Sequence, residues 1–470
     1  MASSTEQILE IIRQLAAERD TFTSDDIRPL LTGDLTPRSI PSAVGKARRD
    51  GIIEEIDRVK SSIPERKGSL VGVFRRPGST LANASSNSDL AQHPSAVVSS
   101  TAQEIIELRA YLERMGYLCG VEELASVLLM LSSRTWLILS GPSGTGKSSL
   151  IRHIASAVGG TLHDVQVKPN WISSEDSLGY FSETSQRFVP GVLSSALIES
   201  AKDTSERFHF VRLDEMNLAA PEYYLAEVLS AAETWRRGTA GRMESDPIQL
   251  PPMPEKVEAP YVALSDNVFL VGTVNVDETT RSLSSKVLDR ASVYDLHHVD
   301  LFGLPAKNDD LQISPPAAPG LVKLLKDRPH SVSELDLPDG LVLEVGELLS
   351  QLNTYAQTLG GPIAYRQRDA LLTLASLAEK HQITDILSRS AVIDIGIRAC
   401  ILPKWQGSTL AAVTALRGAI ATILELDTQP TEISTEVVRS EIPRAKYPRT
   451  ADKLASMLEQ ATNLGYFSAW

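Results

Sequence analysis

A glycine-rich segment, GPSGTGKSS, carries the clearest chemistry in the chain. It follows the short apolar run WLIL and leads into an amphipathic, helix-like run. Glycines in such a loop let backbone N–H groups turn towards phosphate oxygens, and the helix start adds its positive end. Lys147 would reach the β- and γ-phosphates, and the Ser148 hydroxyl would bind Mg²⁺. The expected nucleotide-binding residues of this loop are Gly141, Pro142, Ser143, Gly144, Thr145, Gly146, Lys147, Ser148 and Ser149.

An acidic pair at the end of a second apolar run supplies groups for hydrolysis. In FHFVRLDEMNLA the run ends at Asp214 and Glu215. Asp214 would hold Mg²⁺ through its water shell, and Glu215 would polarise the attacking water. Such a pair alone is often only a solvated strand end, but after a phosphate loop it indicates a hydrolytic site.

A third strand-like run, NVFLVGTVN, ends at Asn275, which could orient the attacking water. After it comes Arg290, with Arg281 and Lys286 as nearby rivals. If subunits form a ring, Arg290 would reach the neighbour's nucleotide and neutralise charge in the transition state. We therefore expect Glu215, Asn275 and Arg290 to be the catalytic residues.

Two further arginines open a helical run in GPIAYRQRDALLTLA. Arg366 or Arg368 could touch the γ-phosphate from above, and Arg366 is the preferred candidate. The alternative is a surface arginine. Trp171 and Phe181 are either central-pore residues or core aromatics, and the polar, proline-rich stretch 236–260 indicates an inserted hairpin or loop.

Composition limits what the whole chain can do. Its 470 residues are enough for about two to four domains. With 46 basic and 59 acidic residues the net charge is −13, which excludes whole-chain attraction to nucleic acid or anionic membranes. Two cysteines exclude a disulfide scaffold. The acidic start has no signal-peptide pattern, and the longest apolar stretch is interrupted by Arg417, so a cytoplasmic protein is expected.

The order of short helical and strand-like runs divides the chain into four parts. Residues 1–78 read as three helices, the second starting at Thr23, followed by a β-hairpin, which is the order of a winged helix. Residues 79–100 are rich in Ser, Ala and Asn and predict a flexible linker. An α/β nucleotide-binding core is expected over 101–334, and an α-helical lid and C-terminal region over 335–470.

A basic patch lies in the N-terminal part. Between positions 36 and 76 there are ten basic residues against five acidic ones. The third helix and the hairpin loop could therefore contact DNA phosphates, although many winged helices bind protein instead. The candidate DNA-binding residues are Arg38, Lys46, Arg48, Arg49, Lys60, Arg66 and Lys67.

The order of phosphate loop, acidic strand end, strand-end Asn and trailing Arg resembles that of AAA+ ATPases. Several blocks are similar to the McrB-type motor subunits of modification-dependent restriction systems: VKPNW…LGYF, LDEMNLA, GTVNVDETTRSLSSKVLDRA, ILPKWQGS and YPRTADKLASMLEQATNLGYFS. This resemblance implies an AAA+ P-loop fold, a homo-hexameric ring and a separate PD-(D/E)xK nuclease subunit, whose constellation is not apparent in this chain. It leaves the nucleotide open between ATP and GTP.

Two other functions compete with a restriction motor. One is a MoxR-like AAA+ chaperone that remodels protein complexes, which would not be expected to carry the LPKWQGS and YPRTADKL blocks. The other is a DNA-binding regulator switched by nucleotide, against which the intact Glu215 argues.

Overall fold

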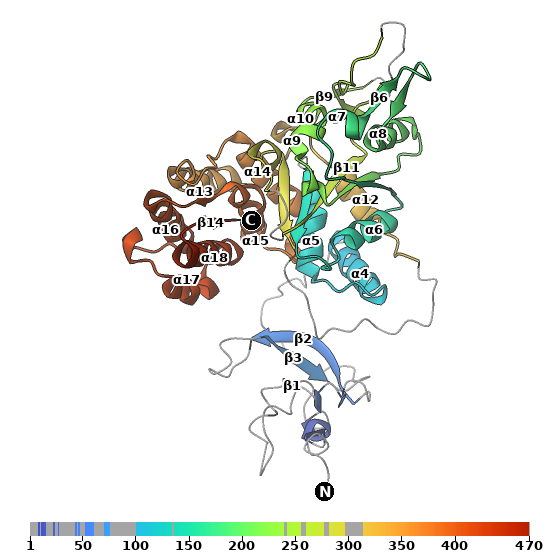
Figure 1. Cartoon of the computed structure of the whole chain (residues 1–470). Coiled ribbons are helices and arrows are strands. Elements are labelled where there is room, and N and C mark those ends of the chain that lie inside the picture. Colours follow the sequence, from blue (N-terminus) through green and yellow to red (C-terminus); the bar gives the residue numbers. More distant parts are fainter. Residues whose placement is uncertain are drawn as a thin grey trace. The chain divides into compact units, whose positions relative to one another are not determined.

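The structure, a computed structural model, forms two compact units, Met1–Ser95 and Ala96–Trp470 (Figure 1). It describes residues 100–133, 136–238, 242–254, 260–276, 282–296 and 314–469, and in the first unit 8–9, 11–15, 22–23, 27, 43–44, 46–47, 52–60 and 70–75. The linker expected over 79–100 lies outside these residues except at position 100.

The first unit contains a three-stranded antiparallel sheet in the order β1-β3-β2. Its strands are β1 (Phe22–Thr23), β2 (Glu54–Lys60) and β3 (Leu70–Arg75). Strand β1 corrects the expectation of a helix beginning at Thr23, because Phe22 and Thr23 pair with β3 instead. A small apolar core joins the described helical residues Ile8, Leu9, Ile12, Leu15, Ile27, Ala43 and Ala47 with Ile53, which precedes β2.

The second unit is built on a parallel sheet of five strands in the spatial order β12-β4-β11-β8-β5. The strands are β4 (Trp136–Gly141), β5 (Thr161–Gln166), β8 (His209–Asp214), β11 (Val268–Asn275) and β12 (Ala291–Asp295). The inner strands are nearly continuous buried runs, as expected where helices cover both faces. Strand β11 lies between β4 and β8, so the carboxyl ends of these three strands meet at one edge.

Alternate side chains of each strand enter two different cores. Leu137, Leu139 and Phe210 face helices α4 (Ser100–Arg114), α5 (Val121–Leu131) and α6 (Lys147–Ala157). Ile138 and Val211 face the opposite layer. That layer includes α8 (Val192–Lys202), α9 (Pro221–Tyr224), α10 (Ala226–Ala231) and α11 (Ser285–Leu288).

Two hairpins extend from this second layer. Strands β6 (Gly179–Ser182) and β7 (Arg187–Pro190) follow the short helix α7 (Ser174–Leu178). Strands β9 (Trp235–Arg237) and β10 (Met243–Ser245) form the hairpin expected in the polar stretch after position 236. Trp171 is buried with its ring edge-on to Tyr224, which favours the core interpretation for that residue.

The last part of the chain is helical (Figure 1). Its main helices are α12 (Pro319–Lys326), α13 (Leu341–Ala356), α14 (Tyr365–Lys380), α15 (Arg389–Cys400), α16 (Leu410–Leu424), α17 (Thr435–Glu441) and α18 (Pro448–Leu464). The blocks ILPKWQGS and YPRT…GYFS meet there, because β13 (Gln406–Gly407) pairs with β14 (Phe467–Ser468). Among the residues described, none of the helices combines the length and the apolarity that crossing a membrane requires.

Candidate nucleotide-binding and hydrolysis site

The glycine-rich loop joins β4 to α6, as its position in the sequence indicates. Gly141 has a φ of +150°, and a Cβ there would lie 2.4 Å from the Leu296 carbonyl oxygen. Gly146 has a φ of +84°, and a Cβ there would lie 2.5 Å from the Tyr117 ring. Both positions therefore need glycine, for backbone conformation and for space.

Lys147 is buried in the first turn of α6 and turns back over the loop. Its Nζ donates hydrogen bonds to the carbonyl oxygens of Gly141, at 2.9 Å, and Pro142, at 2.7 Å. Burial lowers the pKa of Lys147, while Asp214 and Glu215 act in the opposite direction. The ammonium group is thus held within the loop where phosphate would bind.

The neighbouring hydroxyl meets the acidic strand end. Ser148 Oγ donates to Asp214 Oδ1 at 2.7 Å, and Thr273 Oγ1 donates to the same oxygen at 2.9 Å. Hydroxyl and carboxylate oxygens are the ligands that Mg²⁺ prefers, so Ser148 and Asp214 fit a Mg²⁺ site. When bound there with nucleotide, Mg²⁺ would neutralise charge on the phosphates.

Glu215 and Asn275 are also brought together. Asn275 Nδ2 donates to Glu215 Oε1 at 2.8 Å, and the Glu215 backbone N–H donates to Thr273 Oγ1 at 2.9 Å. In the sheet register Asn275 stands opposite Gly141, at the phosphate-loop end of β4. Glu215 has a φ of +51°, an uncommon backbone conformation for a residue with a side chain. The predicted catalytic carboxylate therefore lies beside the loop with its direction fixed by an amide.

Thr273 is a site residue that the sequence analysis missed. Its hydroxyl accepts from the Glu215 backbone and donates to the Asp214 carboxylate, so it joins the two acidic residues. The available signal was its place in VGTVN, two residues before Asn275 on the same strand. In a strand, alternate residues share a face, so Thr273 and Asn275 point to the same side.

Arg212 is a second missed residue, and it is a buried cation inside the strand that carries Asp214. It stands opposite Asp164 of β5 in register and pairs with that carboxylate at 2.7 Å. Its Nη1 donates to the Ser148 carbonyl oxygen at 2.5 Å, and its Nε lies 3.9 Å from Asp214 Oδ1. Arg212 thus links the start of α6 to strands β8 and β5 beside the predicted metal site.

Arg290 lies at the opposite end of the sheet from the phosphate loop. The Trp136 N–H donates to the Arg290 carbonyl oxygen at 3.0 Å, which places Arg290 at the amino end of β4. Gly141, at the carboxyl end, is five residues further along the strand, which corresponds to about 16 Å. Arg290 is therefore not placed to serve the nucleotide of its own chain. Of its rivals, Arg281 lies outside the described residues, and the Lys286 carbonyl accepts from Arg290.

Arg366 lies beside Arg290, and the structure does not bring it to the phosphate loop of its own chain. Both guanidinium groups pair with Glu233 Oε1 at 2.5 Å. Helix α14 is held at this end of the sheet because Gln367 donates to Asp289 at 3.2 Å. This arrangement does not place Arg366 at the phosphate loop of the same chain, and its contact with a γ-phosphate stays a prediction. Arg368 instead pairs with the adjacent Asp369.

The candidate DNA-binding residues lie mostly beyond the described part of the chain. Lys46 is in a helical segment and Lys60 ends β2. The remaining five, Arg38, Arg48, Arg49, Arg66 and Lys67, fall outside the described residues. DNA contact by this unit stays a prediction.

Comparison with known proteins bears on the second unit. Residues 136–291 match the AAA domain family (dynein-related subfamily), and residues 327–466 match a family described as a domain of unknown function (DUF8727). No curated protein matches the chain.

Among solved structures, one similar chain is a candidate ATPase from Cytophaga hutchinsonii, at 14% identity and a TM-score of 0.43. The match covers 65% of this chain and 87% of the other. The match to the AAA domain family spans Ser148, Asp214, Glu215, Asn275 and Arg290. Residues 136–291 are therefore similar to AAA domains of the dynein-related subfamily.

Proposed function

We propose that this chain is a Mg²⁺-dependent nucleoside triphosphatase that works as a ring-shaped motor. The observation that carries the proposal is the hydrogen-bonded set Ser148–Asp214–Thr273–Glu215–Asn275. It gathers a phosphate-loop hydroxyl, a metal-binding carboxylate, a general base and an orienting amide at the ends of three strands. These groups can bind a metal-nucleotide complex, position a water molecule and remove its proton.

We infer that Arg290 and Arg366 both act on the nucleotide of a neighbouring subunit. Both lie at the amino ends of the strands, while the phosphate loop lies at the carboxyl ends. A head-to-tail ring brings one such face against the opposite face of the next subunit. A hexamer is the ring size that the McrB resemblance implies.

The biological role we propose is DNA restriction in anti-phage defence, with a separate PD-(D/E)xK nuclease as effector. The support is the set of McrB-like blocks, of which ILPKWQGS and YPRT…GYFS meet in the helical segment. The N-terminal unit would bring DNA to the motor through its basic patch. The helical residues from position 335 onward would act as the lid of the motor.

One experiment tests this function in cells and in solution. The neighbouring gene is first examined for a PD-(D/E)xK nuclease. Cells that express this chain with the neighbour's product are challenged with phage, and ATP and GTP hydrolysis are measured on the purified protein. Protection that disappears in Lys147→Ala together with hydrolysis supports the proposal. Nucleotide hydrolysis that does not depend on a nuclease, together with a metallo-enzyme encoded by the neighbouring gene, would favour the MoxR-like chaperone.

A further inference from the structure

Glu233 joins two arginines that come from distant parts of the sequence. Arg290 Nη2 and Arg366 Nη2 each lie 2.5 Å from the same oxygen, Glu233 Oε1. The two nitrogens therefore lie no more than about 5 Å apart. Glu233 follows α10, Arg290 precedes β12, and Arg366 is in the first turn of α14. Three elements thus converge on one carboxylate oxygen.

Two guanidinium groups this close repel each other, so something must hold them together. Arg290 is anchored by its own chain as well, because it donates to the carbonyl oxygens of Leu229, at 3.2 Å, and Lys286, at 2.7 Å. Between Arg366 and the AAA+ domain, Glu233 is the link that the described residues show. Removing the Glu233 charge would leave Arg290 largely in place and release Arg366.

The pair remains accessible. The exposed fractions are 22% for the Arg290 side chain, 46% for Arg366 and 35% for Glu233. The three residues line a cavity of about 280 Å³ at the amino end of β4, together with Trp136. Asp289 and Asp369 also line this cavity, but each pairs with a further cation, Lys404 and Arg368 respectively. The two arginines and Glu233 therefore leave a net charge of +1, which can still attract a phosphate group. Guanidinium groups bind phosphate oxygens in fixed, paired geometry, which favours a pre-set spacing.

We propose that Glu233 is a positioning residue that holds Arg290 and Arg366 as a pair for one phosphate group of the neighbouring subunit's nucleotide. The inference rests on the proposed ring and adds to it the residue that sets the geometry of the arginines. Glu233 itself does not touch the nucleotide.

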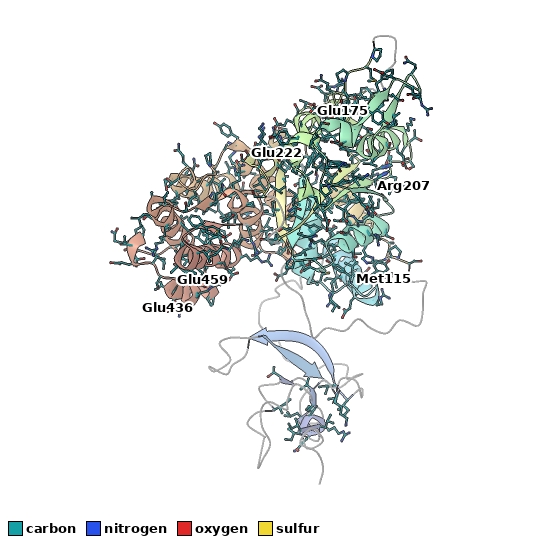
Figure 2. All side chains as sticks on the ribbon, in the orientation of Figure 1. Met115, Glu175, Arg207, Glu222, Glu436 and Glu459 are labelled. Atoms are coloured by element: carbon teal, nitrogen blue, oxygen red, sulfur yellow. The ribbon has the colours of Figure 1, made fainter. Side chains whose placement is uncertain are left out.

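The first test is hydrolysis by Glu233→Gln, which removes the charge and keeps the size of the side chain. We expect kcat to fall about tenfold to a hundredfold with KM nearly unchanged, less than the 10³–10⁵ loss typical of removing an essential arginine. Glu233→Asp keeps the charge and should recover part of the loss. The matched control is Glu436→Gln on α17, an exposed carboxylate in the helical segment (Figure 2), which should leave turnover unchanged.

The second test places Glu233 on one side of the subunit interface by mixing variants. Lys147→Ala subunits cannot bind nucleotide but still present intact arginines. A mixture of Lys147→Ala and Arg290→Ala subunits should regain turnover, because some interfaces then hold an intact phosphate loop and intact arginines. A mixture of Lys147→Ala and Glu233→Gln subunits should regain turnover to the same extent. Glu233→Gln mixed with Arg290→Ala should not recover, because both variants present defective arginines.

The mixing results distinguish a failure of the role proposed for Glu233 from a failure of the proposed ring motor. No recovery of Arg290→Ala with Lys147→Ala contradicts the proposed ring mechanism itself. If that mixture recovers turnover but the mixture of Glu233→Gln with Lys147→Ala does not, only the role proposed for Glu233 is contradicted. Turnover of Glu233→Gln at or above the wild-type rate also contradicts the positioning role of Glu233, because the arginines would then act without its carboxylate.

Discussion

The Ser148 hydroxyl donates a 2.7 Å hydrogen bond to the Asp214 carboxylate, across 66 positions of sequence. Ser148 lies in α6, which follows β4 and the glycine-rich loop, and Asp214 ends β8. Strand β11 lies between β4 and β8, and its Thr273 donates to the same carboxylate oxygen. The proposed phosphate-binding loop and the proposed metal-binding strand end are therefore joined through a third strand. A substitution at the end of β4, β8 or β11 should therefore affect the same site.

The phosphate loop should be intolerant of a side chain at Gly141. In Gly141→Ala the new Cβ meets the Leu296 carbonyl at 2.4 Å, in a backbone conformation that alanine rarely adopts. We expect nucleotide affinity to fall at least about tenfold, measured by titration with a fluorescent nucleotide. Gly159→Ala is the matched control, because Gly159 also has a positive φ, of +67°, but no atom within 4 Å of the new Cβ. Equal affinities of the two variants would contradict this account.

Removing the buried cation beside the metal site should destabilise the fold. Arg212→Met leaves Asp164 and the Ser148 carbonyl without their partner. We expect a loss of about 1–3 kcal/mol in the free energy of unfolding, below the 3–5 typical of a fully buried pair, because the Asp164 side chain is 41% exposed. Asp164→Asn keeps a side-chain oxygen that can accept from Arg212, and Asp214 remains 3.9 Å from Arg212 Nε, so it should cost less than Arg212→Met. Chemical denaturation measures both, and equal losses would contradict the assigned role of Arg212.

Stability should depend on pH through Glu123 at the start of α5. Burial raises the pKa of the Glu123 carboxyl to about 7, although the Gly120 backbone and Arg449 act to lower it. The native state therefore favours the protonated form, and this contribution is fully present below pH 4.5 and lost as the pH rises to about 7. Glu123→Gln should gain stability relative to wild type across that interval, by up to about 3 kcal/mol. Thermal melts from pH 4.5 to 8 test this, and a constant difference would contradict it.

The N-terminal unit provides a separate prediction. If its basic patch binds duplex DNA, the affinity of the full chain for DNA should fall steeply as the salt concentration rises. Each phosphate contacted adds about 0.9 to the slope of the logarithm of affinity against the logarithm of salt concentration. Changing both Arg48 and Arg49 to Ala should make that slope shallower by about 1 to 2. The same change should leave nucleotide hydrolysis intact. Binding that is undetectable or independent of salt would favour a protein partner.

Local order in the sequence was enough to predict where several of the candidate residues lie, while their roles stay predictions. Gly141 to Ser149, Asp214, Glu215 and Asn275 stand at the ends of apolar runs, and parallel strands bring such ends to one edge. The role of Arg212 could not be predicted from the sequence, because it depends on the register that places Arg212 opposite Asp164 of the edge strand β5. The place of Arg366 could not be predicted, because the contact between Gln367 of α14 and Asp289 sets it and no short sequence pattern records that contact. Strand β1 was missed because its two residues are strand only through pairing with β3.

The most direct measurement of the central claim is hydrolysis by Glu215→Gln. The substitution keeps the phosphate loop, Ser148 and Asp214, so Mg²⁺-nucleotide should bind with affinity close to wild type. It removes the carboxylate that Asn275 orients at 2.8 Å, so the attacking water loses its base. We predict that turnover falls at least about 10²-fold while bound nucleotide persists unhydrolysed in the complex. Turnover near the wild-type rate, with nucleotide bound, would contradict the assignment of this site as the hydrolytic centre.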